Sequence, residues 1–166
     1  MSDMTVMMSK KIFLEVCIGI EGLCADLYHY YSEIYVDIPE ASQFWKKTAL
    51  EEENHKRQFE MALRLMNESE FEVTKDGLKR AYAVQYKLLK LIDHVKVNQP
   101  ELLTAVSKAV DMEGQLAELH AHTSLLFKEK SMHTLFRSLS EADQGHVSDM
   151  QRYLNILNLP LCEMEG

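Results

Sequence analysis

Two acid-x-x-His motifs lie 91 residues apart in this chain, and each follows a glutamate by about thirty residues. The glutamates begin two related segments, EGLCADLYHY and EGQLAELHAH, whose first residues are 92 positions apart. Each set therefore consists of one glutamate and one acid-x-x-His motif. The first set is Glu21 with Glu52-x-x-His55, and the second is Glu113 with Asp143-x-x-His146. Four carboxylates and two imidazoles are the donors with which four helices hold a pair of first-row metal ions.

Helical spacing places both acids on apolar faces. Residues i and i+3 share a helix face, so each acid projects together with its histidine. The first motif falls in a stripe with Trp45 and Phe59, and the second falls in a stripe with Phe136 and Met150. No Lys or Arg stands in these stripes. Buried carboxylates cost several kcal/mol each unless neutralised, and two divalent cations would neutralise four of them.

A competing interpretation is that the motifs are ordinary surface pairs. An isolated Glu-x-x-His on a helix is most often a solvated i, i+3 pair. The joint pattern argues against that interpretation here, because two motifs occur and each has a glutamate on the preceding helix. The sequence therefore favours a metal site.

Two further residues stand seven positions after the glutamates, namely Tyr28 and His120. Seven residues are two helical turns, so these side chains lie on the face of the glutamates and can donate hydrogen bonds to the ligand carboxylates. An ordinary core partner for each is the alternative. Cys17 and Cys24 are most simply small core residues.

Composition predicts an almost entirely helical chain, because 166 residues contain only 6 glycines and 3 prolines. Antiparallel hairpins are expected where a tight turn joins two helices, and the long third segment would carry the chain along the bundle. The fold class is thus all-α, a four-helix bundle of two antiparallel hairpins joined by a long, partly helical crossover. The expected helices run from about Lys10 to Tyr35, Pro39 to Met66, Lys75 to Val95, Pro100 to Lys128, and Met132 to Ile156.

Counting from the turns supports a common depth for the acids. Glu21 lies 16 residues before Asp37 and Glu52 lies 15 after it, which places both about 23 Å from the turn. In the second hairpin Glu113 precedes Lys130 by 17 residues, whereas Asp143 follows it by 13. This match is looser, and a slightly shifted turn would absorb the difference.

Charge and segment patterns exclude several classes of protein. The formal charge of -8 argues against a nucleic-acid partner, and two divalent ions would leave about -4 outside the site. No apolar run is long enough to span a membrane, and no secretory leader is seen. Three cysteines without a Cys-x-x-Cys favour the cytoplasm. We expect one domain over residues 1–166, with tails at 1–9 and 158–166.

The six residues resemble those of the ferritin-like di-iron carboxylate proteins, and among them the rubrerythrin group. The resemblance covers about residues 10–155. It implies that Glu52 and Asp143 bridge two iron ions, that Glu21 and Glu113 bind one ion each, and that each histidine takes one. Asp143 stands where glutamate is usual, which puts bridging there in doubt. The cysteine module of many rubrerythrins is absent.

What the resemblance implies is an oxidoreductase that reduces hydrogen peroxide or dioxygen at two iron ions, with electrons from a separate donor protein. It also implies a homodimer. A ferritin-type iron store is one alternative, and a bundle that keeps a metal only as a structural element is another. Manganese or zinc would suit the same donors.

Overall fold

The structure is a computed structural model that describes residues 2–65, 75–125 and 130–158, with the side chains of residues 2–10 and 75 left aside. These ranges contain five α-helices and no strand, which confirms the predicted all-helical class. The helices are α1 (Ser2–Ile34), α2 (Pro39–Leu65), α3 (Lys75–Val97), α4 (Leu102–Ser124) and α5 (Lys130–Leu157).

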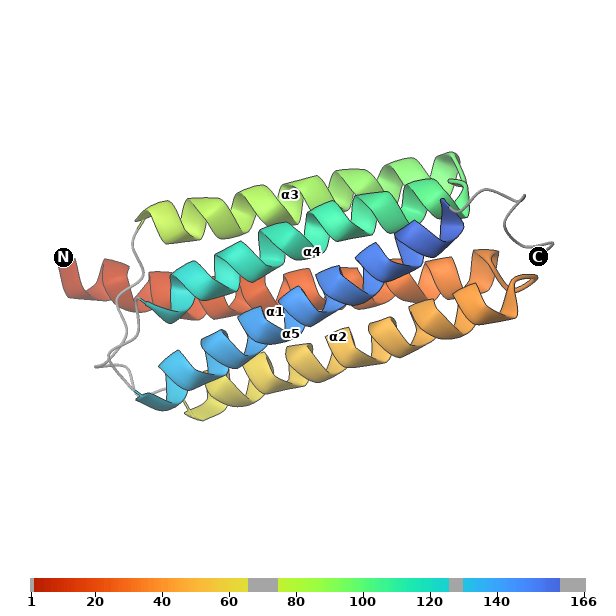
Figure 1. The fold of residues 1–166 in the computed structure, drawn as a ribbon. Helices are drawn as coiled ribbons and strands as arrows, with labels where there is room; N and C mark the ends of the chain where they lie inside the picture. The colour runs from red at the N-terminus through yellow and green to blue at the C-terminus, as the bar shows by residue number, and fades with distance from the viewer. Residues whose placement is uncertain (1, 66–74, 126–129, 159–166) are drawn as a thin grey trace.

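Two antiparallel hairpins, α1–α2 and α4–α5, form the body of the bundle (Figure 1). The helix α3 runs along the outside for most of the bundle's length and packs on α1 and α4. It returns the chain to the end at which α2 began, so α4 starts beside the α1–α2 turn and runs parallel to α2. The expected helical crossover is therefore present as α3.

The helix ends follow the predicted breaks. Pro39 opens α2, where its missing N–H would have had no helical partner in any case. Before α4 the backbone of Glu101 is extended, with φ -65° and ψ 151°, and the preceding Pro100 cannot belong to a helix interior. Residues 2–9, where a tail is expected, continue α1 as helix from Ser2, and no Gly or Pro interrupts them. The expected tail at 159–166 lies outside the described residues.

The helix α3 contributes a buried stripe although it stands outside the two hairpins. Leu88 and Ala81 are fully buried, seven residues apart on one face. On the α1 side, a Cβ added at Gly19 would stand 3.1 Å from Nε2 of Gln85. A glycine at this position lets α3 approach α1 closely, so the crossover is a packed element of the core.

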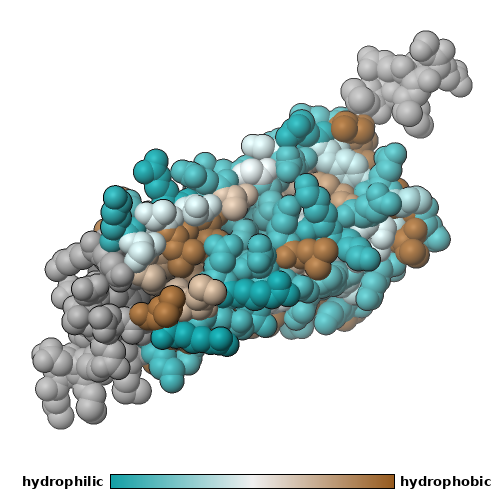
Figure 2. All heavy atoms as spheres, turned by 90° about the horizontal axis from the view of Figure 1, so that it is seen from below, coloured by the Kyte–Doolittle hydropathy of each residue, from teal (hydrophilic) through white to brown (hydrophobic). Residues whose placement is uncertain are grey.

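The face of the molecule drawn in Figure 2 is largely hydrophilic over the described residues. Figure 2 shows one face, on which apolar side chains form separate groups among polar ones. Among the described residues, no helix has the length and apolar character needed to cross a membrane.

We expect Leu88→Ala to destabilise the fold by about 2–4 kcal/mol, because it removes a fully buried side chain from the α3 stripe. Leu89→Ala is the matched control, since this neighbour is 44% exposed and should change stability by no more than about 0.5 kcal/mol. Urea denaturation followed by circular dichroism measures both. Equal effects of the two substitutions would contradict the packing of α3 described above.

Candidate metal centre

All six residues singled out by their types and spacing lie together inside the bundle. The four carboxylate residues are fully buried, and the two histidines are 7% and 8% exposed. The two hairpins contribute equally, with one glutamate from the first helix of each and one acid-x-x-His motif from the second. The residues are Glu21 on α1, Glu52 and His55 on α2, Glu113 on α4, and Asp143 and His146 on α5.

The side chains form two groups that could each hold a metal ion, and Glu52 belongs to both. The donor atoms within each group lie within 4.8 Å of one another. The first group has three members and the second has four. They are Glu21, Glu52 and His55, and Glu52, Glu113, Asp143 and His146.

The two oxygens of Glu52 face different imidazoles. Its Oε2 lies 3.3 Å from Nδ1 of His55, and its Oε1 lies 3.0 Å from Nδ1 of His146. A carboxylate placed in this way can give one oxygen to each of two ions. Glu52 therefore has the geometry of a bridging residue.

Asp143 does not share that geometry, in contrast to the bridging role that the resemblance implied. It belongs to one group only, and its Oδ2 lies 2.6 Å from Nδ1 of His120. The physical reason is its shorter side chain, which lacks one methylene and leaves one oxygen engaged with His120. Of the two carboxylate oxygens of Asp143, Oδ1 has no hydrogen-bond partner among the described residues.

Several polar atoms of this cluster are buried without a hydrogen-bond partner. They are both oxygens of Glu21, both oxygens of Glu52, Oδ1 of Asp143, Nδ1 of His55 and Nε2 of His120. Most buried polar atoms in proteins are hydrogen-bonded, and an unpaired one costs about 1–3 kcal/mol. Unpaired carboxylate oxygens and imidazole nitrogens that face one another are the donor set that divalent cations need, so the residues fit a pair of metal ions.

Tyr28 and His120 link the two hairpins through the carboxylates. The hydroxyl of Tyr28 donates a hydrogen bond to Oε1 of Glu113. Reciprocally, Nε2 of His120 lies 3.3 Å from Oε1 of Glu21. Each residue thus contacts the glutamate of the other half, which is the relation expected of a two-fold repeat. Both contacts orient a carboxylate of the cluster.

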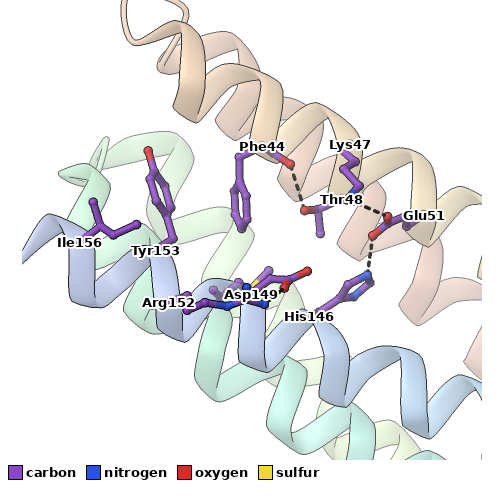
Figure 3. Close-up of a pocket in the computed structure, with 10 residues that line it drawn as sticks. Phe44, Lys47, Thr48, Glu51, His146, Asp149, Arg152, Tyr153 and Ile156 are labelled. Atoms are coloured by element: carbon purple, nitrogen blue, oxygen red, sulfur yellow. Dashed lines mark hydrogen bonds and ion pairs between the residues drawn. The ribbon is translucent and has the colours of Figure 1, made fainter.

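Glu51 is a contact of the site that the sequence did not indicate. Its Oε2 lies 2.7 Å from Nε2 of His146 (Figure 3). The imidazole is therefore held between Glu51 and the carboxylates on its Nδ1 side. In the sequence Glu51 reads as part of a solvated acidic run, and the repeat gives no signal because Ala142 stands 91 residues later.

A surface pocket of about 380 Å³ lies against this histidine, between α2 and α5. Apolar side chains such as Phe44 and Tyr153 line it together with the charged Lys47 and Arg152. Glu51 and His146 also line the pocket. It therefore brings solvent to one edge of the cluster.

Burial and mutual repulsion govern the pKa values of the metal-free cluster. Burial, followed by the charge of Glu52, raises the pKa of Glu113 to about 7 and that of Glu21 well above its usual range. Burial opposes protonation of His146, but the hydrogen bond with Glu113 and the contact with Glu52 raise its pKa to about 11. Burial also opposes ionisation of Glu52, yet the two imidazoles beside it lower its pKa. In the absence of metal ions, bound protons must neutralise the charge of the carboxylates.

Comparisons of the chain with models of known families, with curated proteins and with solved structures gave no match. The chemistry of the site therefore has to be argued from its own geometry.

The metal-free protein should lose stability as the pH rises from about 5 to about 8. The raised pKa of Glu113, about 7, means that its proton stabilises the folded state, and this stabilisation is lost as the pH climbs from the ordinary value through about 7. The raised pKa of His146, about 11, also makes the protein less stable as the pH rises, once the pH exceeds the ordinary pKa of histidine. The lowered pKa of Glu52 acts oppositely, but only at more acidic pH.

Thermal unfolding of chelator-treated protein measures the effect. We expect the midpoint to fall by at least about 5 °C over this range, and divalent cations to restore it at the alkaline end. Glu113→Gln keeps the shape without the charge and should flatten the dependence. An unfolding midpoint that does not change with pH in the metal-free protein would contradict the burial of these carboxyl groups without a neutralising cation.

Proposed function

We propose that this protein is a ferritin-like di-iron carboxylate oxidoreductase of rubrerythrin type, which reduces hydrogen peroxide or dioxygen with electrons from a separate donor protein. The proposal rests on one observation above all, the pair of buried donor groups that share Glu52. A single structural ion would need one such group. Two adjacent groups with a common carboxylate suit chemistry that takes two electrons at once.

The donor set favours iron or manganese over softer metals. Carboxylates outnumber imidazoles in both groups, and no cysteine is among the donors; oxygen-rich sites of this kind suit the harder divalent ions. Iron bound here would supply the electrons that reduce an O–O bond. Glu21 and His55 would complete one position, and Glu113, Asp143 and His146 the other.

The remaining residues would keep that centre in place. Tyr28 and His120 hold carboxylates of the opposite hairpin, and Glu51 holds His146 with its Nδ1 directed at the cluster. Fully buried neighbours, among them Phe59 and Leu116, keep bulk water away. The pocket beside His146 is wide enough to admit a small oxidant.

Metal content tests the shared role of Glu52. Protein loaded with ferrous iron without oxygen should bind about two ions per chain. Glu52→Ala should remove both, because it breaks both groups, whereas His55→Ala should remove one. Glu53→Ala is the matched control, since its carboxylate pairs with His29 outside the cluster, and it should keep both ions. Elemental analysis and titration calorimetry measure binding, and full retention of iron by Glu52→Ala would refute the shared position.

Peroxide consumption tests the chemistry. The ferrous protein should consume about one hydrogen peroxide per two irons, because two electrons and two protons convert one peroxide to two waters. Absorption spectroscopy with a peroxide assay follows the reaction, and repeated cycles should require an added one-electron reductant. Iron that stays ferrous with both peroxide and dioxygen would exclude the oxidoreductase.

A ferritin-type iron store would use the same donors, so the size of the assembly separates the two functions. We expect a homodimer in size-exclusion chromatography with light scattering. A shell of many subunits, with accumulation of iron far beyond two ions per chain, would favour storage.

A further inference from the structure

A series of aromatic side chains leads from the cluster to one end of the bundle. Tyr28, which donates its hydrogen bond to Glu113, stacks on Trp45 with ring centroids 5.3 Å apart. Trp45 lies 4.8 Å from the ring of Tyr31, and Tyr31 lies 6.1 Å from Tyr35. We call Tyr28, Trp45, Tyr31 and Tyr35 the aromatic series.

The outer end of the aromatic series lies where two turns meet. The hydroxyl of Tyr35 donates to the carbonyl oxygen of Pro100 at 2.6 Å, which joins the α1–α2 turn to the α3–α4 turn. The neighbouring Val36 and Val97 are 65% and 82% exposed. The aromatic series therefore connects the buried cluster with an accessible surface.

The second half of the molecule fills the equivalent positions with different side chains. The repeat counterparts of Tyr28, Trp45 and Tyr31 are His120, Phe136 and Thr123. His120 and Phe136 keep a ring contact, at 6.1 Å, and the Thr123 hydroxyl donates to the carbonyl oxygen of Leu119. The same places are thus filled there by side chains that are hard to oxidise.

At two of these positions the first half of the molecule buries polar groups without partners, whereas the second half does not. Nε1 of Trp45 and the hydroxyl of Tyr31 are buried without a hydrogen-bond partner. Phenylalanine at both positions would fill the core without leaving a buried donor unpaired. Packing alone therefore does not account for tryptophan and tyrosine here, whereas their ease of one-electron oxidation does.

We propose that the aromatic series conducts single electrons between the surface at Tyr35 and the metal centre, with Trp45 as the intermediate station. This rests on the proposed function, in which a peroxide takes two electrons from the centre and a one-electron donor protein must return them singly. Trp45 would give one electron to the oxidised centre through the ring of Tyr28 and its hydrogen bond to Glu113. The donor protein would then return one electron to Trp45 through the rings of Tyr35 and Tyr31. Oxidised Trp45 keeps its proton, because no acceptor faces Nε1, and is a radical cation.

Flash photolysis on metal-free protein tests the conduction without any reaction of iron. A ruthenium polypyridyl label is attached at Val36→Cys in a Cys162→Ser background, where the other two cysteines, Cys17 and Cys24, are buried. A flash with a soluble electron acceptor produces ruthenium(III), which removes one electron from the protein and returns to ruthenium(II). We expect the transient absorption of a tryptophan radical cation.

Controls isolate the path. A label at Leu125→Cys, exposed at the opposite end of α4, should give a signal about tenfold slower or none. Trp45→Phe, which copies the Phe136 position, should abolish the signal, and Phe44→Leu should leave it intact, because this neighbour at 5.2 Å carries no easily oxidised ring. In ferrous protein the radical should decay about tenfold faster, as the centre refills Trp45.

The outcomes separate this inference from the proposed function. Absence of a tryptophan radical in the Val36-labelled protein, or an equally fast radical from the label at Leu125→Cys, overturns the conduction even if peroxide is consumed. A neutral tryptophan radical overturns the role of the unpaired Nε1. A radical cation in metal-free protein that decays equally fast with and without bound ferrous iron shows that the aromatic series does not reach the centre, and so overturns the inference too.

Discussion

The structure depends on neutralising four carboxylates that are fully buried. The imidazoles of His55, His120 and His146 can supply at most three positive charges, so protons on the carboxyl groups or metal ions must balance the rest. The arrangement of the cluster follows from this constraint. The helices bring the acids to one depth, and Tyr28 and His120 contact carboxylates across the hairpins. Both oxygens of Glu21 and of Glu52 still have no hydrogen-bond partner among the described residues. An interior arranged in this way is costly when empty and is completed by two cations.

The repeat provides the symmetry of the cluster, and single substitutions break it. Glu52 and Asp143 are counterparts, yet only Glu52 reaches both imidazoles, since Asp143 is one methylene shorter and engages His120. His55 and His146 are counterparts too, but only His146 has a glutamate on its outer nitrogen. The two metal positions are therefore unequal in the number of donors and in the rigidity of their histidines.

The sequence predicted the helices, their order and the six residues of the cluster because those depend on period and spacing, which a duplicated pattern makes visible. It did not predict the contacts that depend on relative rotation of the helices. The partner of Tyr28 is Glu113 on the other hairpin, and Glu51 contacts the outer nitrogen of His146 although Glu53, two residues later, turns to His29. The series Tyr28, Trp45, Tyr31 and Tyr35 was likewise hidden, because its members come from two helices that pack side by side only in the folded chain.

The crossover helix explains how a duplicated hairpin can enclose one site instead of two. Had α2 led directly into α4 by a short turn, the second hairpin would run antiparallel to its present direction, and its acids would meet the first pair in the reverse order. By carrying the chain along the bundle, α3 makes α2 parallel to α4 and α1 parallel to α5, so that Glu21 faces His120 while Glu113 faces Tyr28. This reciprocity is what a two-fold axis between the hairpins requires. The packing of α3 against α1 and α4 is therefore a condition for the cluster, even though α3 contributes none of its donors.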